Sequence, residues 1–227
     1  MQRRIRLLAF AACIAAPPAA AASGDDETLL DAIRDNDSEL IARAVYAGSA
    51  IDVAAGDGKT MLMAAAADGN MALVEHLLAK HVDPGARNDR GGTALMYAAA
   101  NGEVTTARRL LAAGAPPDDR AENGWTALTL AAAKGHEPVV SLLLAAGADP
   151  DIPDVFGFTP LMRAAQNGRR NAVARLLADP RTDIGKRNVG GDDALAVAVG
   201  TGDCAIVALV RAAIPAYHDR ANPCPDP

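Results

Sequence analysis

The sequence has no long apolar run, few aromatic residues and no excess of basic charge. Half of its 227 residues are hydrophobic, yet no stretch reaches the roughly 20 consecutive apolar residues of a transmembrane helix. Acidic residues outnumber Lys and Arg by 28 to 22, which argues against a surface for nucleic acid or anionic lipid. Only one Trp and three Phe are present, so each of them stands out as a candidate protein contact.

Patterns that would indicate an active site are also missing. His76 and His81 lie five residues apart, off one helical face, and the sequence contains no His-Glu-x-x-His or Cys-x-x-Cys pattern. The glycine pairs Gly91-Gly92 and Gly190-Gly191 are not followed by the Lys-Ser/Thr of a phosphate-binding loop. We therefore expect no catalytic residue, no metal and no cofactor.

One group of acidic residues could suggest calcium. Asp149, Asp151 and Asp154 alternate within a loop, and calcium takes carboxylate ligands. Similar aspartates recur at the same place in other units, as Asp83, Asp118 and Asp183. Hydrogen bonding within the loops is the simpler explanation of all of them.

The dominant feature of the chain is a repeat. A tetrapeptide with Thr first and Leu third recurs every 33 residues, at 60–63, 93–96, 126–129 and 159–162. A Gly lies two residues before each Thr and another nine after it, and one inserted residue near 177–183 makes the next step 34. Such a period indicates an array of one supersecondary unit, whose apolar faces are buried by stacking on the neighbouring units.

Each unit predicts two helices and a loop. Thr126 is a good N-cap, the apolar segment 127–132 forms a short helix, and Gly135 ends it in the left-handed conformation. Pro138 suits the start of a second helix, whose stripe of Val and Leu at 139–144 faces the core. We count six such units, four of them regular.

Several motifs resemble those of ankyrin repeats: Gly-Phe-Thr-Pro-Leu at 157–161, Ala-Ala at 164–165, Asn-Gly at 167–168, Leu-Leu at 176–177 and Gly135-His136. The resemblance covers residues 25–213 and implies an all-α solenoid of about six helix-turn-helix units with extended β-hairpin-like finger loops. It also implies a structural role for His136. Where the family often has His after Thr-Pro-Leu, this chain has Met63, Met96, Thr129, Met162 and Ala196, which puts the usual side-chain hydrogen bonds of that His in doubt.

The chain divides into five parts. We assign residues 1–22 to a signal peptide, 23–57 to a degenerate N-terminal capping repeat, 58–190 to four regular repeats, 191–214 to a C-terminal capping repeat and 215–227 to a Pro-rich tail.

The first 22 residues have the layout of a secretory signal: a basic start, an apolar stretch at 7–16 and small residues at 20–22 before Ser23. One alternative is a lipoprotein signal with Cys13 lipidated, and another is a further helix of the array. Ordinary cleavage would remove three Arg and take the formal net charge from −6 to −9. We expect a periplasmic or secreted protein without membrane insertion after cleavage.

Cleavage would leave two cysteines, Cys204 and Cys224, in a compartment where disulfides persist. We predict that they pair, tie the tail across the end of the array and stabilise it by about 3 kcal/mol. The alternative is a buried Cys204 and a free thiol in the tail. Thiol titration of the denatured, exported protein is expected to find no free thiol, and two free thiols would contradict the pairing.

The resemblance implies that the finger loops and the first helices line a concave face that binds a protein. Trp125, Phe156 and Phe158 lie on adjacent fingers, with arginines nearby, and such side chains often anchor interfaces. Alternatively, Trp125 and Phe158 pack against neighbouring fingers and stiffen them. Tyr97 and Arg163 are expected to be packing residues. The candidate contacts are Arg87, Arg90, Asn101, Arg120, Asn123, Trp125, Lys134, Phe156, Phe158 and Asn167.

The function expected from this pattern is a non-enzymatic, monomeric protein-binding module of the bacterial envelope. It resembles periplasmic ankyrin proteins, a group associated with supporting envelope enzymes such as catalase. The alternative is an inhibitor or immunity protein that occludes a toxic envelope enzyme. The repeat does not identify the partner.

Overall fold

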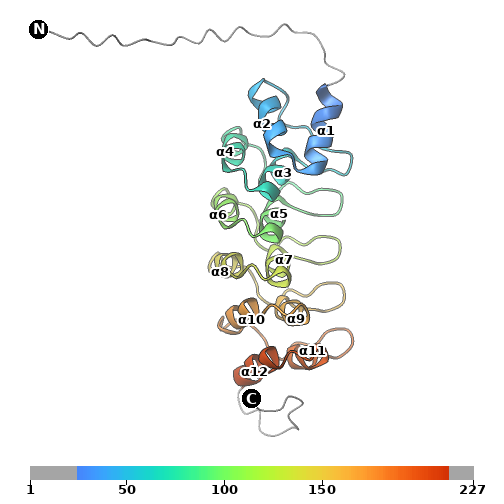
Figure 1. Ribbon diagram of the computed structural model, residues 1–227, viewed down its shortest axis with the longest axis vertical. Helices are drawn as coiled ribbons and strands as arrows, with labels where there is room; N and C mark the ends of the chain where they lie inside the picture. The colour runs from blue at the N-terminus through green and yellow to red at the C-terminus, as the bar shows by residue number, and fades with distance from the viewer. Residues whose placement is uncertain (1–24, 215–227) are drawn as a thin grey trace, which may run out of the picture.

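The computed structural model describes residues 25–214, which form twelve α-helices and no named strand (Figure 1). The helices are α1 (Asp25–Asp35), α2 (Ser38–Tyr46), α3 (Met61–Asp68), α4 (Met71–Ala79), α5 (Ala94–Asn101), α6 (Val104–Ala112), α7 (Ala127–Lys134), α8 (Glu137–Ala145), α9 (Pro160–Gln166), α10 (Arg170–Leu177), α11 (Ala194–Thr201) and α12 (Cys204–Ala213).

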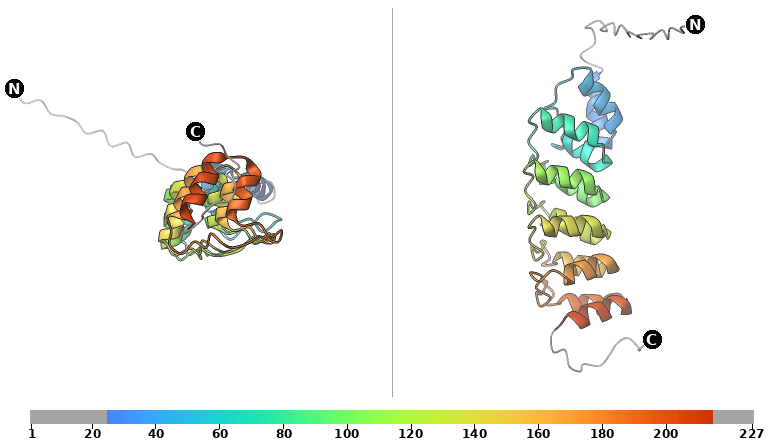
Figure 2. Two further views of the ribbon diagram at one scale, coloured as in Figure 1. Left: turned by 90° about the horizontal axis from the view of Figure 1, so that it is seen from below. Right: turned by 90° about the vertical axis from the view of Figure 1, so that its left-hand side faces the viewer.

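The helices stack in two layers. Contacts join α3, α5, α7, α9 and α11 in one layer and α4, α6, α8, α10 and α12 in the other. The loops that precede the odd-numbered helices from α3 onward project to one side of the elongated stack, and they overlie one another in the end-on view (Figures 1 and 2). This arrangement confirms the all-α solenoid predicted from the repeat.

The recurring Thr begins each helix of the first layer. The hydroxyls of Thr60, Thr93, Thr126 and Thr159 accept hydrogen bonds from the amides three residues later, at 3.2 to 3.4 Å, and Asp193 does the same for α11. Those amides belong to the positions where the family has His. Because the cap accepts from the backbone N–H of that position, Met, Thr or Ala there leaves the start of the helix intact, and the side chains of Met63 and Thr129 add contacts to the cap residue.

The core lies between the two layers. One Leu from each regular repeat's first helix is at most 1% exposed (Leu62, Leu95, Leu128 and Leu161), and small alanines around them let the helices approach closely. Helices α4, α6, α8 and α10 each contain two adjacent leucines. The first leucine of each pair is fully buried, at 77, 110, 143 and 176, whereas among the second leucines only Leu144 is buried. Adjacent residues on a helix point about 100° apart, so both leucines of a pair cannot face the core equally.

We call the segments 53–59, 86–92, 119–125, 152–158 and 186–192 finger loops one to five. One backbone hydrogen bond closes each of them, for example from Ala121 N to Trp125 O at 2.9 Å. Another joins each finger loop to the next, as from Glu122 N to Arg90 O at 2.9 Å and from Val155 N to Asn123 O at 3.1 Å. The five loops therefore form one hydrogen-bonded row.

The inserted residue near 177–183 makes room for a clamp between units. Arg181 donates to the carbonyls of Leu144 and Ala148, at 2.9 and 3.1 Å, and so reaches the end of α8. Its guanidinium also donates to the carboxylate of Asp179, whose side chain is only 9% exposed. Asp179 thus holds the Arg181 side chain over the preceding unit.

Replacing Asp179 by Ala is expected to lower the free energy of unfolding by about 1–2 kcal/mol at pH 7. Hydrogen bonds from Arg181 hold the pKa of Asp179 below its ordinary value. Because the unfolded chain then takes up the proton first, this stabilisation is present above about pH 4 and is lost as the pH falls through the lowered pKa. In urea unfolding, the difference in the free energy of unfolding between the variant and wild type should be smaller at pH 3 than at pH 7. Glu39→Ala, which removes an exposed ion pair with Arg43, should change little at either pH.

Three predictions fall partly or wholly outside the described residues. The signal peptide 1–22, the tail 215–227 and Cys224 are all beyond them. Cys204, the first residue of α12, is exposed, which does not fit the alternative of a buried Cys204. Between residues 25 and 214, every helix is too short or too polar to cross a bilayer.

Candidate functional site

Two of the three predicted aromatic contacts surround Arg163, a residue of α9. The guanidinium lies 4.2 Å from the centre of the Phe158 ring and 5.5 Å from that of Trp125. Both distances suit cation–π attraction. The Arg163 side chain is 14% exposed, so this group is a packed unit joining finger loops three and four to α9.

Asp154 lies at the centre of this group around Arg163, and its side chain is fully buried. One carboxylate oxygen accepts from the amides of Phe156 and Phe158, at 2.9 and 3.0 Å. The other accepts from Trp125 Nε1 at 3.2 Å and from Arg163 Nε at 2.7 Å. These contacts favour the alternative in which Trp125 and Phe158 stiffen the fingers, and they agree with the packing role expected for Arg163.

Phe156 is placed differently from the other two aromatics. It is 62% exposed at the tip of finger loop four, beside Val155 at 55% and Val189 at 80%. Its carbonyl accepts from Val189 N at 2.9 Å, which connects the tips of finger loops four and five. We call Val155, Phe156 and Val189 the finger-tip patch. Exposed apolar side chains grouped in this way are typical of protein-binding surfaces.

The three predicted arginines divide into two kinds. Arg87 pairs with Asp119 at 3.1 Å and donates to the carbonyl of Arg120, while Arg120 donates to the carbonyl of Pro153 at 2.8 Å. Both therefore bridge to the next finger loop. Arg90 is exposed, and among the described residues no hydrogen bond or ion pair engages its guanidinium. It is the arginine that a partner can reach without breaking a contact.

The polar candidates are also spread over two regions. Asn123 lies in finger loop three, where its side-chain oxygen accepts from Trp125 N at 3.0 Å. Asn101 and Asn167 are exposed and donate to carbonyls one turn back, in Tyr97 and Arg163. Lys134 ends α7 and lies beside Arg169 and Arg170, at the opposite end of that helix from the finger loop. Asn101, the last residue of α5, and Asn167, the C-cap of α9, hold the same repeat position. We therefore exclude all three from the finger-loop surface.

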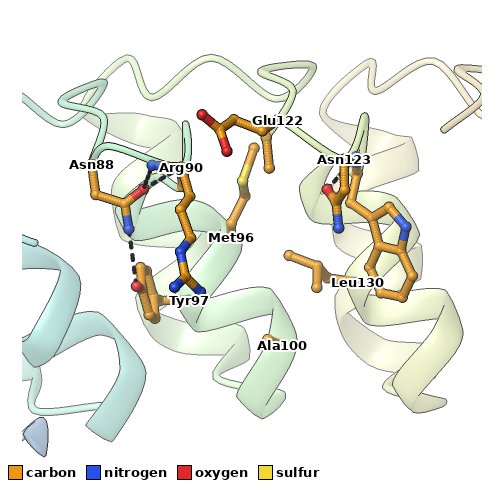
Figure 3. A pocket seen from close by; sticks show the side chains of 11 residues that line it. Asn88, Arg90, Met96, Tyr97, Ala100, Glu122, Asn123 and Leu130 are labelled. Carbon is orange, nitrogen blue, oxygen red and sulfur yellow. Dashed lines mark hydrogen bonds between the residues drawn. The ribbon is translucent and has the colours of Figure 1, made fainter. Parts of the chain in front are cut away.

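A pocket of about 340 Å³ opens between finger loops two and three (Figure 3). Met96, Tyr97, Ala100 and Leu130 form its apolar floor, on α5 and α7, and Trp125 also lines it. Arg90, Glu122 and Asn123 stand at its rim in the finger loops, and the Arg90 side chain extends toward Tyr97 (Figure 3).

Met96, Leu130 and Glu122 were not among the predicted contacts, and Tyr97 was expected to be a packing residue. The repeat contains a signal that could have identified the floor. At the helix position of Leu130, successive repeats carry Ala64, Tyr97, Leu130, Arg163 and Val197. Of these five residues only Ala64 is fully buried, and the other four are partly exposed. The wide variation therefore marks a position whose surroundings differ from unit to unit.

Tyr97 connects this pocket to the N-terminal units. Its hydroxyl accepts from Asn88 Nδ2 at 3.2 Å, and Lys59 Nζ lies 5.5 Å from its ring centre. Burial, together with the charge of Asp57, raises the pKa of Tyr97. Lys59 is 5% exposed and donates to the carbonyl of Arg34, at the end of α1, at 2.7 Å. Burial lowers the pKa of Lys59, and the neighbouring Asp57 opposes that shift.

The loop aspartates accept hydrogen bonds from backbone amides, as expected if they stabilise the loops rather than bind calcium. Asp118 accepts from Asp149 N at 3.0 Å, and both oxygens of Asp151 accept from Asp183 N. Burial raises the pKa of Asp151. Between residues 25 and 214, no group of three or more His, Cys, Asp or Glu could hold a metal ion.

His136 makes a structural contact of the expected kind. Its Nε2 is 3.0 Å from the carbonyl of Ala100, in the preceding unit. Arg169 occupies the same place one repeat later and donates to the carbonyl of Ala133 at 3.1 Å. Both side chains join the end of one first-layer helix to the following unit.

One comparison with known proteins identifies a family. A family model described as ankyrin repeats (3 copies) matches residues 29–121, 62–154 and 106–188. These matches together span more than half of the chain. No curated protein matches the chain.

Proposed function

Because the chain belongs to the ankyrin repeat family, whose repeats are protein-interaction modules, we propose that it binds a protein partner of the bacterial envelope through its finger loops and first-layer helices. In this proposal it is a monomer that performs no catalysis itself and supports an envelope enzyme. The envelope location rests on the export signal expected at residues 1–22. The acidic balance of the chain also makes nucleic acid an unsuitable partner.

The observation that carries the proposal is the exposed Phe156 in a firmly held finger loop. The Phe156 ring is 62% exposed, although Asp154 and the neighbouring finger loop fix the backbone on both sides of it. Because the backbone that carries it is already ordered, this large apolar side chain costs little backbone entropy on binding and is well suited to anchor a partner.

Affinity capture from a periplasmic extract tests this function. We expect wild type to retain a defined partner and the Phe156→Ser variant to lose at least about 2 kcal/mol of binding free energy, a hot-spot effect of roughly thirtyfold in Kd. Tyr46→Ser is the matched control, because Tyr46 is 57% exposed on α2, away from finger loops four and five. Equal capture by wild type and both variants would contradict the proposal.

A further inference from the structure

We propose that the pocket between finger loops two and three holds one large aliphatic or aromatic side chain from an extended segment of the protein partner. In that segment an acidic residue engages Arg90 and a basic residue engages Glu122. The inference rests on the proposed function and specifies what the partner must present.

The lining of the pocket suits an apolar side chain. Its floor combines Met96, Tyr97, Ala100 and Leu130, and its volume of about 340 Å³ lies near the lower end of the usual range for binding pockets. An apolar side chain placed there leaves water and meets apolar surface on several sides. Burial of a Leu, Met or Phe side chain is a favourable contribution to binding. A charged or small side chain would gain little from the same floor.

The walls of the pocket are already ordered. The backbone bond from Glu122 N to Arg90 O, 2.9 Å long, joins the two finger loops across the mouth of the pocket. The Trp125 indole is fixed by its hydrogen bond to Asp154, and Asn88 is fixed by three hydrogen bonds, two from loop amides and one to Tyr97. Because these groups need not be ordered on binding, more of the contact energy is available for affinity.

The rim of the pocket carries two charges of opposite sign. Arg90 and Glu122 are both exposed and have opposite charges, yet among the described residues neither side chain has an ion-pair or hydrogen-bond partner. Arg87 and Arg120, in the same two finger loops, are both engaged. A partner with complementary charges on the two sides of its apolar residue satisfies Arg90 and Glu122 together, which selects orientation as well as affinity.

A peptide segment suits the pocket better than a small enclosed ligand. The pocket opens onto the row of finger loops, and the side-chain NH₂ of Asn123 stands at its rim without a partner among residues 28–214. That group can donate to a backbone carbonyl of a crossing segment. In an extended chain, alternate side chains face the same way, so the three recognised residues are expected at alternate positions.

The probe is a capped peptide, Ac-Gly-Ser-Glu-Ser-Leu-Ser-Lys-Ser-Gly-NH2. It is titrated to about 5 mM into the isotope-labelled exported protein, and binding is followed by NMR. This range detects a millimolar Kd, which corresponds to about 4 kcal/mol of binding free energy. We expect saturable shifts at the amides of Met96, Ala100 and Leu130 and at the Trp125 indole. A peptide with Ala for Leu should bind at least about fivefold more weakly, as expected for lost apolar burial. Exchanging Glu and Lys keeps the composition and should also weaken binding. No saturable shift at these sites, or equal binding of the three peptides, would overturn the proposal.

Two variants of the protein sharpen the test. Ala100→Leu fills the pocket from its floor and should abolish the shifts. Ala67→Leu is its control, since Ala67 holds the equivalent, half-buried position one repeat earlier and does not line the pocket. Arg90→Gln should weaken binding of the probe peptide but not of a peptide with Gln in place of its Glu. Arg108→Gln, on the exposed surface of α6, should change the binding of neither peptide. Thermal melting confirms that each variant is folded.

Capture of the natural partner separates this proposal from the broader function. If Phe156→Ser loses the partner while Ala100→Leu and Arg90→Gln retain it, the pocket proposal is wrong and the proposed function stands. If all three variants capture the partner as wild type does, the proposed function is contradicted as well.

Discussion

Replacing Asp154 by Ala is expected to lower the free energy of unfolding by about 3–5 kcal/mol, because it leaves a mostly buried Arg without its carboxylate. The change also removes the acceptor for the Trp125 indole and for the amides of Phe156 and Phe158. Each buried donor left without an acceptor adds to the loss. The cluster that fixes finger loops three and four should therefore loosen.

Urea unfolding followed by circular dichroism measures this loss, and the fluorescence of Trp125, the sole Trp of the chain, reports on the cluster itself. Asp154→Asn should fall between wild type and Asp154→Ala, since an amide keeps an oxygen acceptor for the loop. Asp119→Ala is the matched control: its ion pair with Arg87 is partly exposed and should contribute about 1 kcal/mol or less. Equal losses for Asp119→Ala and Asp154→Ala would contradict the central role of Asp154.

Replacing Gly157 by Ala is expected to lower the free energy of unfolding by about 2–5 kcal/mol, through two effects. Its φ of +80° lies in the left-handed region, where a side chain costs roughly 1–2 kcal/mol. An added Cβ would also lie 2.8 Å from Val189 N and 2.9 Å from Asn188 Cα. Both are backbone atoms of finger loop five, so relief requires the two loops to move apart, with further strain of about 1–3 kcal/mol.

Gly168→Ala separates these two effects. Gly168 has a φ of +70°, but an added Cβ would meet nothing within 4 Å, so only the conformational cost of about 1–2 kcal/mol is expected. Comparing the two variants by urea unfolding gives the contribution of close loop packing. If Gly157→Ala proved no worse than Gly168→Ala, the finger loops would be less tightly fixed than the hydrogen bonds indicate.

The period of the sequence predicted most of the fold, because caps, turns and core leucines are set by local chemistry that recurs with each unit. Thr126 and Gly135 begin and end α7 as expected. Even the bridge from Arg87 to Asp119 follows from the period, since a partner 32 residues away lies at nearly the same place in the next unit. Such contacts can be found by comparing each residue with the position one repeat later.

The candidate site was predicted less completely, because the orientation of a loop side chain depends on residues of other elements. Trp125 and Phe158 both follow a finger Gly, yet their orientation depends on Arg163, a helix residue that the period alone does not relate to them. Phe156 lies only two residues from Phe158 but remains exposed. The pocket depends on the sizes of neighbouring side chains, such as Leu130 and Ala100, and these combine only once two units are packed together.

The row of finger loops has a consequence for how the protein responds to load. Each loop is joined to the next by a backbone bond, and further side-chain ties from all five loops reach neighbouring elements, through Lys59, Arg87, Arg120, Asp154 and Lys186. Such ties therefore run along the whole row, and the five loops are expected to shift together under load rather than one at a time. A partner seated anywhere on the row meets a nearly fixed template.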